Sequence, residues 1–149
     1  MHRVSDDSGI RMLLVEDEEV ARVTLGRMLS MKYPNARIFT AENGRRGLEL
    51  YRLHLPDLVI SDINMPHLTG IEMARDIRRE DNLAQVIFLT AHSEARQLME
   101  AKSIGVPHYV LKPVDRNELF AAISRCLASR YAGAGHPETA FRDGGLCKL

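Results

Sequence analysis

Residues 57–66 have the sequence Asp-Leu-Val-Ile-Ser-Asp-Ile-Asn-Met-Pro, and this stretch decides the fold. The run Leu58-Val59-Ile60 is continuously apolar, as expected of a strand that is buried on both faces of a parallel sheet. An acidic residue, Asp62, ends the run, and a connection that contains Pro66 follows. The pattern predicts a central strand that carries a polar side chain at its carboxyl end.

Similar apolar runs alternate with amphipathic segments between Ile10 and Arg130. This alternation predicts an α/β fold, in which a doubly wound five-stranded parallel sheet has helices on both faces. The first, third and fourth runs are richest in Leu, Ile and Val, so we expect them to be central and the other two to be outer. In chain order the expected strands are residues 10–15, 36–40, 57–61, 85–90 and 108–111.

Helix starts are marked twice by an oxygen-bearing cap three residues before a glutamate, in Thr69–Glu72 and in Asp115–Glu118. Apolar residues at helical spacing predict amphipathic helices near both ends of the domain. In the first helix these residues are Ala21, Leu25, Met28 and Leu29, and in the last they are Leu119, Ala122, Ile123, Cys126 and Leu127.

The chain is 149 residues long, 45% hydrophobic and 27% charged, which is typical of a globular domain. A chain of this length folds without disulfides or a structural metal. Its cysteines, Cys126 and Cys147, are too few for a disulfide framework, and we expect both to be reduced. We expect one folded domain over residues 10–131, a flexible N-terminus at residues 1–9, and a flexible tail or linker stub at residues 132–149.

Twenty basic side chains balance twenty acidic ones. Binding to a phosphate backbone normally needs an excess of Lys and Arg, so nucleic acid is not an expected direct partner. The apolar runs are much shorter than the about 20 residues that cross a bilayer, and the N-terminus lacks the pattern of a secretory signal. The sequence therefore predicts a cytoplasmic protein with no membrane segment.

Polar side chains follow four of the expected strands. Glu16 and Asp17 come after the first, Asp62 after the third, Thr90 ends the fourth, and Lys112 follows the fifth. Because the carboxyl ends of parallel strands meet at one edge of the sheet, we expect these side chains to lie together. Clustered carboxylates repel one another unless a cation intervenes, which points to a hard divalent ion such as Mg²⁺.

Each of these residues taken alone has an ordinary structural explanation. An acidic pair before a helix interacts with the helix N-terminus, and an aspartate at the end of a strand forms turns. Thr90 fits a strand, and Lys112 fits a solvated surface. Four independent strand ends that supply complementary groups favour a site instead.

The motifs at the strand ends resemble those of the receiver domains of two-component response regulators, and the match runs from about Ile10 to Arg130. The matching motifs are Val15-Glu16-Asp17-Glu18, residues 57–66, Gly70, Leu89-Thr90-Ala91 and Tyr109-Val-Leu-Lys112-Pro113. The resemblance implies a flavodoxin-like fold with strand order 2-1-3-4-5.

The resemblance also implies how the site works. Asp62 would be the phosphoacceptor, and it would take a phosphoryl group from a histidine of a sensor kinase or of a histidine phosphotransfer protein. Thr90 and Lys112 would each contact a phosphoryl oxygen. The domain would catalyse only its own phosphorylation and dephosphorylation, so it is not expected to be an enzyme acting on other substrates.

A metal site follows from the same resemblance. Mg²⁺ or Mn²⁺ would be held by Asp17 and Asp62, by the backbone carbonyl of Asn64, and by Glu16 directly or through water. The metal and Lys112 would neutralise charge in a loose transition state, so no general base is needed.

Other positions are assigned regulatory roles by the resemblance. Tyr109 would swing inward when Thr90 moves toward the phosphoryl group, although an aromatic on an edge strand is the ordinary explanation. Pro113 would follow a cis peptide bond that aims Lys112 into the site. Asn64 and His92 would flank the approach of the hydrolytic water and tune phosphate lifetime, although an exposed histidine at a loop is the ordinary explanation for His92.

The leading interpretation is a phosphorylation-dependent signalling module that contacts a downstream protein or output domain. The domain either stands alone or is a receiver excised from a larger hybrid kinase or regulator. A homodimer would use the last helix, the fifth strand and the preceding helix. A metal-dependent phosphatase is disfavoured because it needs a second acid at position 64, where Asn64 stands. A receiver that binds partners without phosphorylation would not need this complete set of site residues.

Overall fold

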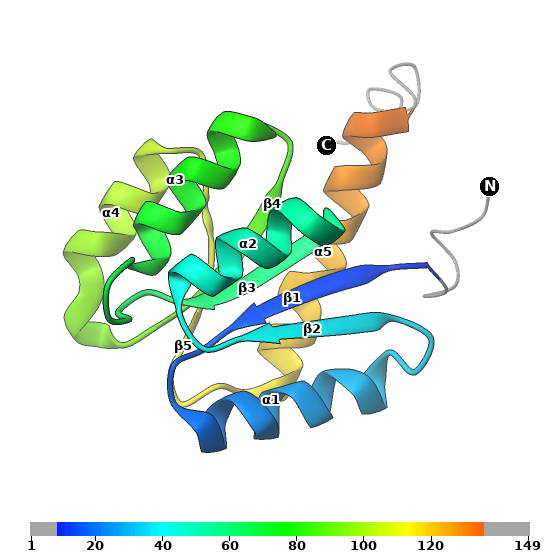
Figure 1. Ribbon diagram of the computed structural model, residues 1–149, viewed down its shortest axis with the longest axis horizontal. Helices are drawn as coiled ribbons and strands as arrows, with labels where there is room; N and C mark the ends of the chain where they lie inside the picture. Colours follow the sequence, from blue (N-terminus) through cyan, green and yellow to red (C-terminus); the bar gives the residue numbers. More distant parts are fainter. Residues whose placement is uncertain (1–8, 136–149) are drawn as a thin grey trace.

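The computed structural model describes residues 9–135. Parallel strands form one sheet in the order β2-β1-β3-β4-β5, which confirms the predicted fold class and strand order (Figure 1). As predicted, the three central strands are the first, third and fourth, and the other two lie at the edges. The strands are β1 (Arg11–Val15), β2 (Arg37–Ala41), β3 (Leu58–Asp62), β4 (Gln85–Thr90) and β5 (His108–Leu111).

Helices cover both faces of this sheet (Figure 1). On one face lie α1 (Glu19–Lys32) and α5 (Arg116–Gly135), and on the other lie α2 (Gly44–His54), α3 (Gly70–Glu80) and α4 (Ala95–Ser103). A short 3₁₀ helix, η2 (His92–Glu94), connects β4 to α4. Within residues 9–135, no helix combines the length and the apolar character needed to span a membrane.

The sheet separates two hydrophobic cores, because successive residues of a strand point to opposite faces. In β1, Leu13 and Val15 pack on the side of α2 and α3, whereas Met12 and Leu14 pack on the side of α1 and α5. All four side chains have no exposed surface. Burying a side chain of this kind contributes about 1.5–3 kcal/mol, so both layers of helices are held firmly to the central strands.

The two predicted helix starts are confirmed. Thr69 caps α3, because its Oγ1 accepts a hydrogen bond from the Glu72 backbone at 3.1 Å and the Glu72 carboxylate accepts one from the Thr69 backbone at 3.0 Å. At the start of α5, Asp115 accepts a hydrogen bond from the Glu118 backbone at 3.1 Å. The last helix runs to Gly135, past position 131 where we placed the end of the domain. Residues 1–8 and 136–149 lie outside the described residues.

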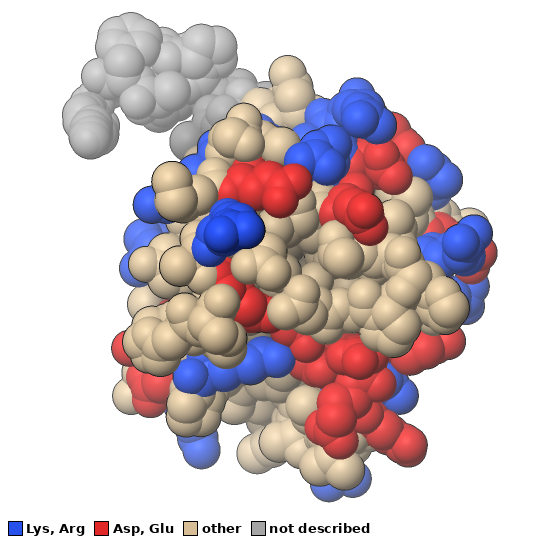
Figure 2. All heavy atoms as spheres, turned by 90° about the vertical axis from the view of Figure 1, so that its left-hand side faces the viewer, with Lys and Arg blue, Asp and Glu red and all other residues tan. Residues whose placement is uncertain are grey.

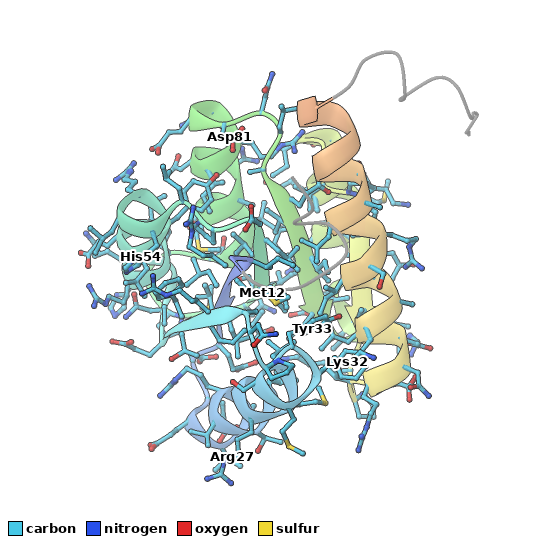
Figure 3. The ribbon with its side chains drawn as sticks, turned by 90° about the vertical axis from the view of Figure 1, so that its right-hand side faces the viewer. Met12, Arg27, Lys32, Tyr33, His54 and Asp81 are labelled. Atoms are coloured by element: carbon cyan, nitrogen blue, oxygen red, sulfur yellow. The ribbon has the colours of Figure 1, made fainter. Side chains whose placement is uncertain are left out.

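Contacts between aromatic and cationic side chains join α1 to α5. The ring of Tyr33, which caps α1, lies edge-on to Phe120 of α5 with 6.1 Å between ring centres. Lys32 Nζ lies 5.2 Å from the centre of the same Phe120 ring. Figure 3 shows Lys32 and Tyr33 at the end of α1 that faces α5. Contacts of these two types each add about 0.5–1.5 kcal/mol, so they link the two helices that cover this face of the sheet.

The reactivity of the Cys126 thiol provides a test of how tightly α5 packs. Its side chain is wholly buried, and burial raises the pKa of the thiol to about 12. Because the thiolate is the reactive form, we expect iodoacetamide to leave Cys126 unmodified in the native protein and to alkylate it after unfolding in denaturant. Intact mass of a Cys147→Ser variant, in which Cys126 is the sole thiol, gives the readout. Rapid alkylation of the native variant would contradict this packing.

Candidate functional site

Polar residues from four strands meet at the carboxyl edge of the sheet. Glu16 and Asp17 follow β1, Asp62 ends β3, Thr90 ends β4, and Lys112 follows β5. Oxygens of the Glu16, Asp17 and Asp62 carboxylates all lie within 4.8 Å of one another. Figure 2 shows this end of the molecule, where acidic side chains form a continuous patch. The structure therefore brings together residues that are up to 96 positions apart in the chain (Glu16 to Lys112).

Asp62 lies at the centre of the site and is only 6% exposed. Its Oδ1 accepts hydrogen bonds from Lys112 Nζ and from the backbone nitrogen of Ile63, each at 2.9 Å. Both donors therefore approach the same oxygen. The second carboxylate oxygen, Oδ2, receives no hydrogen bond from these two groups and retains its lone pairs for bonding.

Burial and crowding shift the acidity of the site. Burial raises the pKa of Asp62 above its usual value, and the hydrogen bond and charge of Lys112 offset the rise only in part. Burial also raises the pKa of Glu16 to about 6, against a hydrogen bond from the Glu18 backbone and with a further rise from the charge of Asp62. Burial by itself would lower the pKa of Lys112, but the hydrogen bond with Asp62 and the surrounding carboxylates raise it overall. Lys112 is therefore held as a cation, and burial disfavours the ionised form of both carboxyl groups.

Backbone contacts fix the segments that carry these side chains. Glu16 Oε2 accepts a hydrogen bond from the Glu18 backbone at 3.1 Å, and Glu18 in turn caps α1 by accepting from the backbone of Ala21 at 2.8 Å. The Lys112 backbone donates to the carbonyl oxygen of Thr90 at 2.7 Å, which joins the ends of β5 and β4. The peptide bond from Lys112 to Pro113 is cis, as the sequence resemblance implies.

A close approach at Gly70 holds the segment after Asp62. The Gly70 backbone donates to the carbonyl oxygen of Ile63 at 2.8 Å. A Cβ atom at position 70 would overlap the carbonyl oxygen of Asp62 and would lie 3.1 Å from the Ile63 Cα. Only glycine fits, because backbone atoms rather than a flexible side chain occupy the space.

The hydroxyl of Thr90 is not free in this structure. It donates a hydrogen bond to Glu94 Oε1 at 2.9 Å, and the Ala91 backbone donates to the same oxygen at 2.7 Å. The side-chain nitrogen of Asn64 donates to the other oxygen, Glu94 Oε2. Glu94 is 7% exposed. The sequence analysis did not identify this residue, and the only available signal was an acidic residue four positions after Thr90.

The remaining predicted residues lie at the margin of the site. Asn64 is exposed as a whole, although its side chain bonds to Glu94. His92 is exposed at the first position of η2. Tyr109 lies on β5 and is 42% exposed.

The donor set at the carboxylate cluster fits a divalent cation. Glu16, Asp17 and Asp62 offer only oxygen ligands, which is the donor type that Mg²⁺ and Mn²⁺ take in proteins. Lys112 is the one cation that donates a hydrogen bond to this cluster among the described residues, against three carboxylates. A cation placed among these three carboxylates would supply the missing positive charge.

Comparison with known proteins identifies the class to which this fold and site belong. A family model described as the response regulator receiver domain matches residues 12–124. The chain therefore belongs to the response regulator receiver family, whose members take part in two-component signalling. This confirms the family indicated by the sequence motifs.

Individual relatives differ in how much of their own length the match to this chain covers. The chain is 37% identical over 119 residues to the regulatory protein AtoC of Escherichia coli, a match that covers 78% of this chain but 25% of AtoC. It is 31% identical to the chemotaxis protein CheY of Bacillus subtilis, covering 78% of this chain and 97% of CheY. A receiver domain from Clostridium thermocellum has a similar crystal structure, with 26% identity, a TM-score of 0.75, and coverage of 80% of this chain and 94% of that one. The chain thus spans a quarter to a half of the first regulators that it matches and nearly all of the chemotaxis protein.

Replacing Gly70 tests the close approach that holds the Asp62 segment. We expect Gly70→Ala to lower the free energy of unfolding by more than about 1 kcal/mol, because the added methyl group overlaps backbone atoms. Gly26→Ala in α1 is the matched control, since its Cβ would meet only Thr40 Cγ2 at 3.8 Å. That control should gain about 0.5–1 kcal/mol from helix propensity. Urea unfolding measures both, and equal stability of the two variants would refute the steric account.

Proposed function

We propose that this domain takes a phosphoryl group onto Asp62 from a phosphohistidine of a sensor kinase or of a histidine phosphotransfer protein. A carboxylate oxygen of Asp62 forms a bond to phosphorus while the bond from phosphorus to the histidine nitrogen breaks, and that nitrogen keeps the electron pair. The ionised carboxylate has no proton to lose, so no general base is required. The contact of 2.9 Å between Lys112 Nζ and Asp62 Oδ1, beside the carboxylate cluster, is the observation that supports this function most directly.

The attacking atom in this proposal is Asp62 Oδ2. The hydrogen bonds from Lys112 and Ile63 both go to Oδ1, so the carboxylate is held in one orientation and neither of them occupies the lone pairs of Oδ2. The side chain is nearly buried, which limits the solvent that has to be displaced on attack. Alignment of this kind is the main contribution that a protein makes to a loose phosphoryl transfer.

Glu16, Asp17, Asp62 and the backbone carbonyl of Asn64 are the groups that we propose to hold Mg²⁺ or Mn²⁺. When bound, the cation would neutralise negative charge on the phosphoryl oxygens. Lys112, which is kept protonated by its carboxylate neighbours, would contact a second phosphoryl oxygen, and the hydroxyl of Thr90 would donate to a third.

Hydrolysis of the phosphorylated Asp62 returns the domain to its unphosphorylated state. A water oxygen bonds to phosphorus, the bond from phosphorus to the Asp62 oxygen breaks, and inorganic phosphate leaves. Asn64 and the exposed His92 lie along the two connections that border Asp62, so we propose that their side chains set how readily water approaches.

The signal would pass through the surface formed by α4, β5 and α5. Thr90 lies at the start of the connection to α4, and Tyr109 on β5 has an exposed side chain that is free to change position. We propose that this surface contacts a downstream protein, an output domain or a second copy of the chain. The same site would serve a stand-alone receiver and a receiver that is part of a larger hybrid kinase or regulator.

Phosphorylation at Asp62 is tested by incubation with Mg²⁺ and a small acyl phosphate. We expect intact mass to show one added phosphate that is stable in acid and labile in alkali. Asp62→Asn should abolish it, because the amide lacks the nucleophilic oxygen. Asp76→Asn on α3 is the matched control, since Asp76 pairs with Arg79 away from the site. Persistent labelling of Asp62→Asn would place the phosphate on another residue.

The metal site is tested by Asp17→Asn. We expect Mg²⁺ to raise the melting temperature of the native sequence, and we expect this substitution to weaken Mg²⁺ affinity by more than about tenfold because an ionised ligand is lost. Without Mg²⁺ the variant should be at least as stable as the original, because repulsion among the carboxylates falls. Thermal unfolding across a Mg²⁺ titration measures both effects.

Glu19→Gln is the control for charge alone, since Glu19 is the first residue of α1, two positions after Asp17, and is exposed. It should keep the Mg²⁺ response of the original protein. An unchanged response in Asp17→Asn would exclude Asp17 as a ligand.

A further inference from the structure

We propose that Glu94 is an internal latch that holds the Thr90 hydroxyl and the Ala91 backbone N–H in the unphosphorylated state, and that a phosphoryl group on Asp62 must displace it. This inference rests on the proposed function of Asp62. The Glu94 latch is defined by three hydrogen bonds to one carboxylate, from Thr90, Ala91 and Asn64.

The geometry of the latch resembles that of a bound anion. Glu94 Oε1 accepts from the Thr90 hydroxyl at 2.9 Å and from the Ala91 backbone at 2.7 Å, while Oε2 accepts from the Asn64 side chain. A phosphoryl group presents the same kind of acceptor, a negatively charged oxygen, to the same donors. Because a hydroxyl has one proton, Thr90 cannot donate to Glu94 and to a phosphoryl oxygen at the same time.

A purely structural role explains only part of this arrangement. As the third residue of η2, Glu94 is placed to accept from the Ala91 backbone and so cap the short helix. That role does not require a hydrogen bond to Thr90, the last residue of β4, or to Asn64, which follows β3. It also does not require burial, yet Glu94 is 7% exposed. The carboxylate instead connects the Asp62 segment to the Thr90 segment.

Displacement of Glu94 has a direct consequence for η2 and α4. A phosphoryl group brings nearly two negative charges, so a buried carboxylate that has lost its donors is repelled and has to move toward water. Among the residues of α4 only Ala101 is fully buried, so this helix is held by little apolar surface. Release of Glu94 would therefore shift η2 and the start of α4 at low cost.

The latch is tested by the affinity of the Mg²⁺-loaded domain for beryllofluoride, which binds aspartate as a mimic of the phosphoryl group. Glu94→Ala removes the competing acceptor, so we expect beryllofluoride to bind about tenfold more tightly than to the original protein. Glu94→Gln keeps a neutral acceptor, so its affinity should fall between the two. Amide NMR titrations measure the affinities and follow the Ala91 amide directly.

Controls separate the latch from simple loss of charge. Glu100→Ala removes an acidic residue from α4 that is exposed and pairs with Arg75, and it should bind beryllofluoride like the original protein. Equal gains in Glu94→Ala and Glu94→Gln would assign the effect to charge alone and overturn the latch. No gain in either variant would also overturn it. If Glu94→Ala does not fold, a gain in Glu94→Gln that disappears in a Thr90→Val background supports the latch, and a gain that persists there, or no gain, overturns it.

The dependence on Thr90 provides a second criterion. In a Thr90→Val background, Glu94→Ala should have a much smaller effect on beryllofluoride affinity, because the hydroxyl for which the two anions compete is gone. An undiminished effect would contradict the latch. If the original protein with Mg²⁺ binds no beryllofluoride, both the function proposed for Asp62 and the latch proposal are rejected. If the original binds it and the variants do not differ, the latch alone fails.

Discussion

Gathering carboxylates at the end of a buried sheet is the constraint on which the rest of this structure depends. Glu16 and Asp62 are 3% and 6% exposed, and their oxygens lie near those of Asp17. Burial and mutual repulsion both oppose ionisation, so the arrangement persists only because other groups compensate. The Lys112 ammonium and the backbone of Ile63 supply hydrogen bonds to Asp62, and the backbone of Glu18 supplies one to Glu16. The free energy that stabilises the fold against this cost comes from the apolar side chains of the buried strands, which pack away from the site.

Net charge describes this protein poorly where its chemistry takes place. The chain is neutral in sum, yet three acidic side chains face one lysine at the carboxyl edge of the sheet. Basic residues are used elsewhere, for example Arg52 with Glu80 between α2 and α3 and Arg75 with Glu100 between α3 and α4. These exposed pairs each contribute little to stability. The positions of the charged side chains, and not their sum, indicate where the functional site lies.

Sequence patterns predicted the sheet, its central and outer strands, and the residues Glu16, Asp17, Asp62, Thr90 and Lys112 at its edge. This succeeded because continuous apolar runs and polar strand ends depend on local composition. Glu94 was not predicted, because an acidic residue near the start of a helix usually interacts only with its own backbone. Its bonds to Thr90 and Asn64 depend on how two loops approach one another, which composition does not encode. The extent of α5 was not predicted either, since Ala and Gly after position 131 carry no periodic pattern, and the helix runs to Gly135.

Division of the interior by the sheet into two separate cores has a consequence for the evolution of the domain. Side chains that support α2, α3 and α4 belong to one core, and those that support α1 and α5 belong to the other. A substitution in one core therefore leaves the packing of the opposite layer largely unaffected. The two layers are free to diversify at different rates, so one can acquire new recognition properties while the other preserves an existing contact. The strand ends that carry Asp62 and Thr90 are common to both layers.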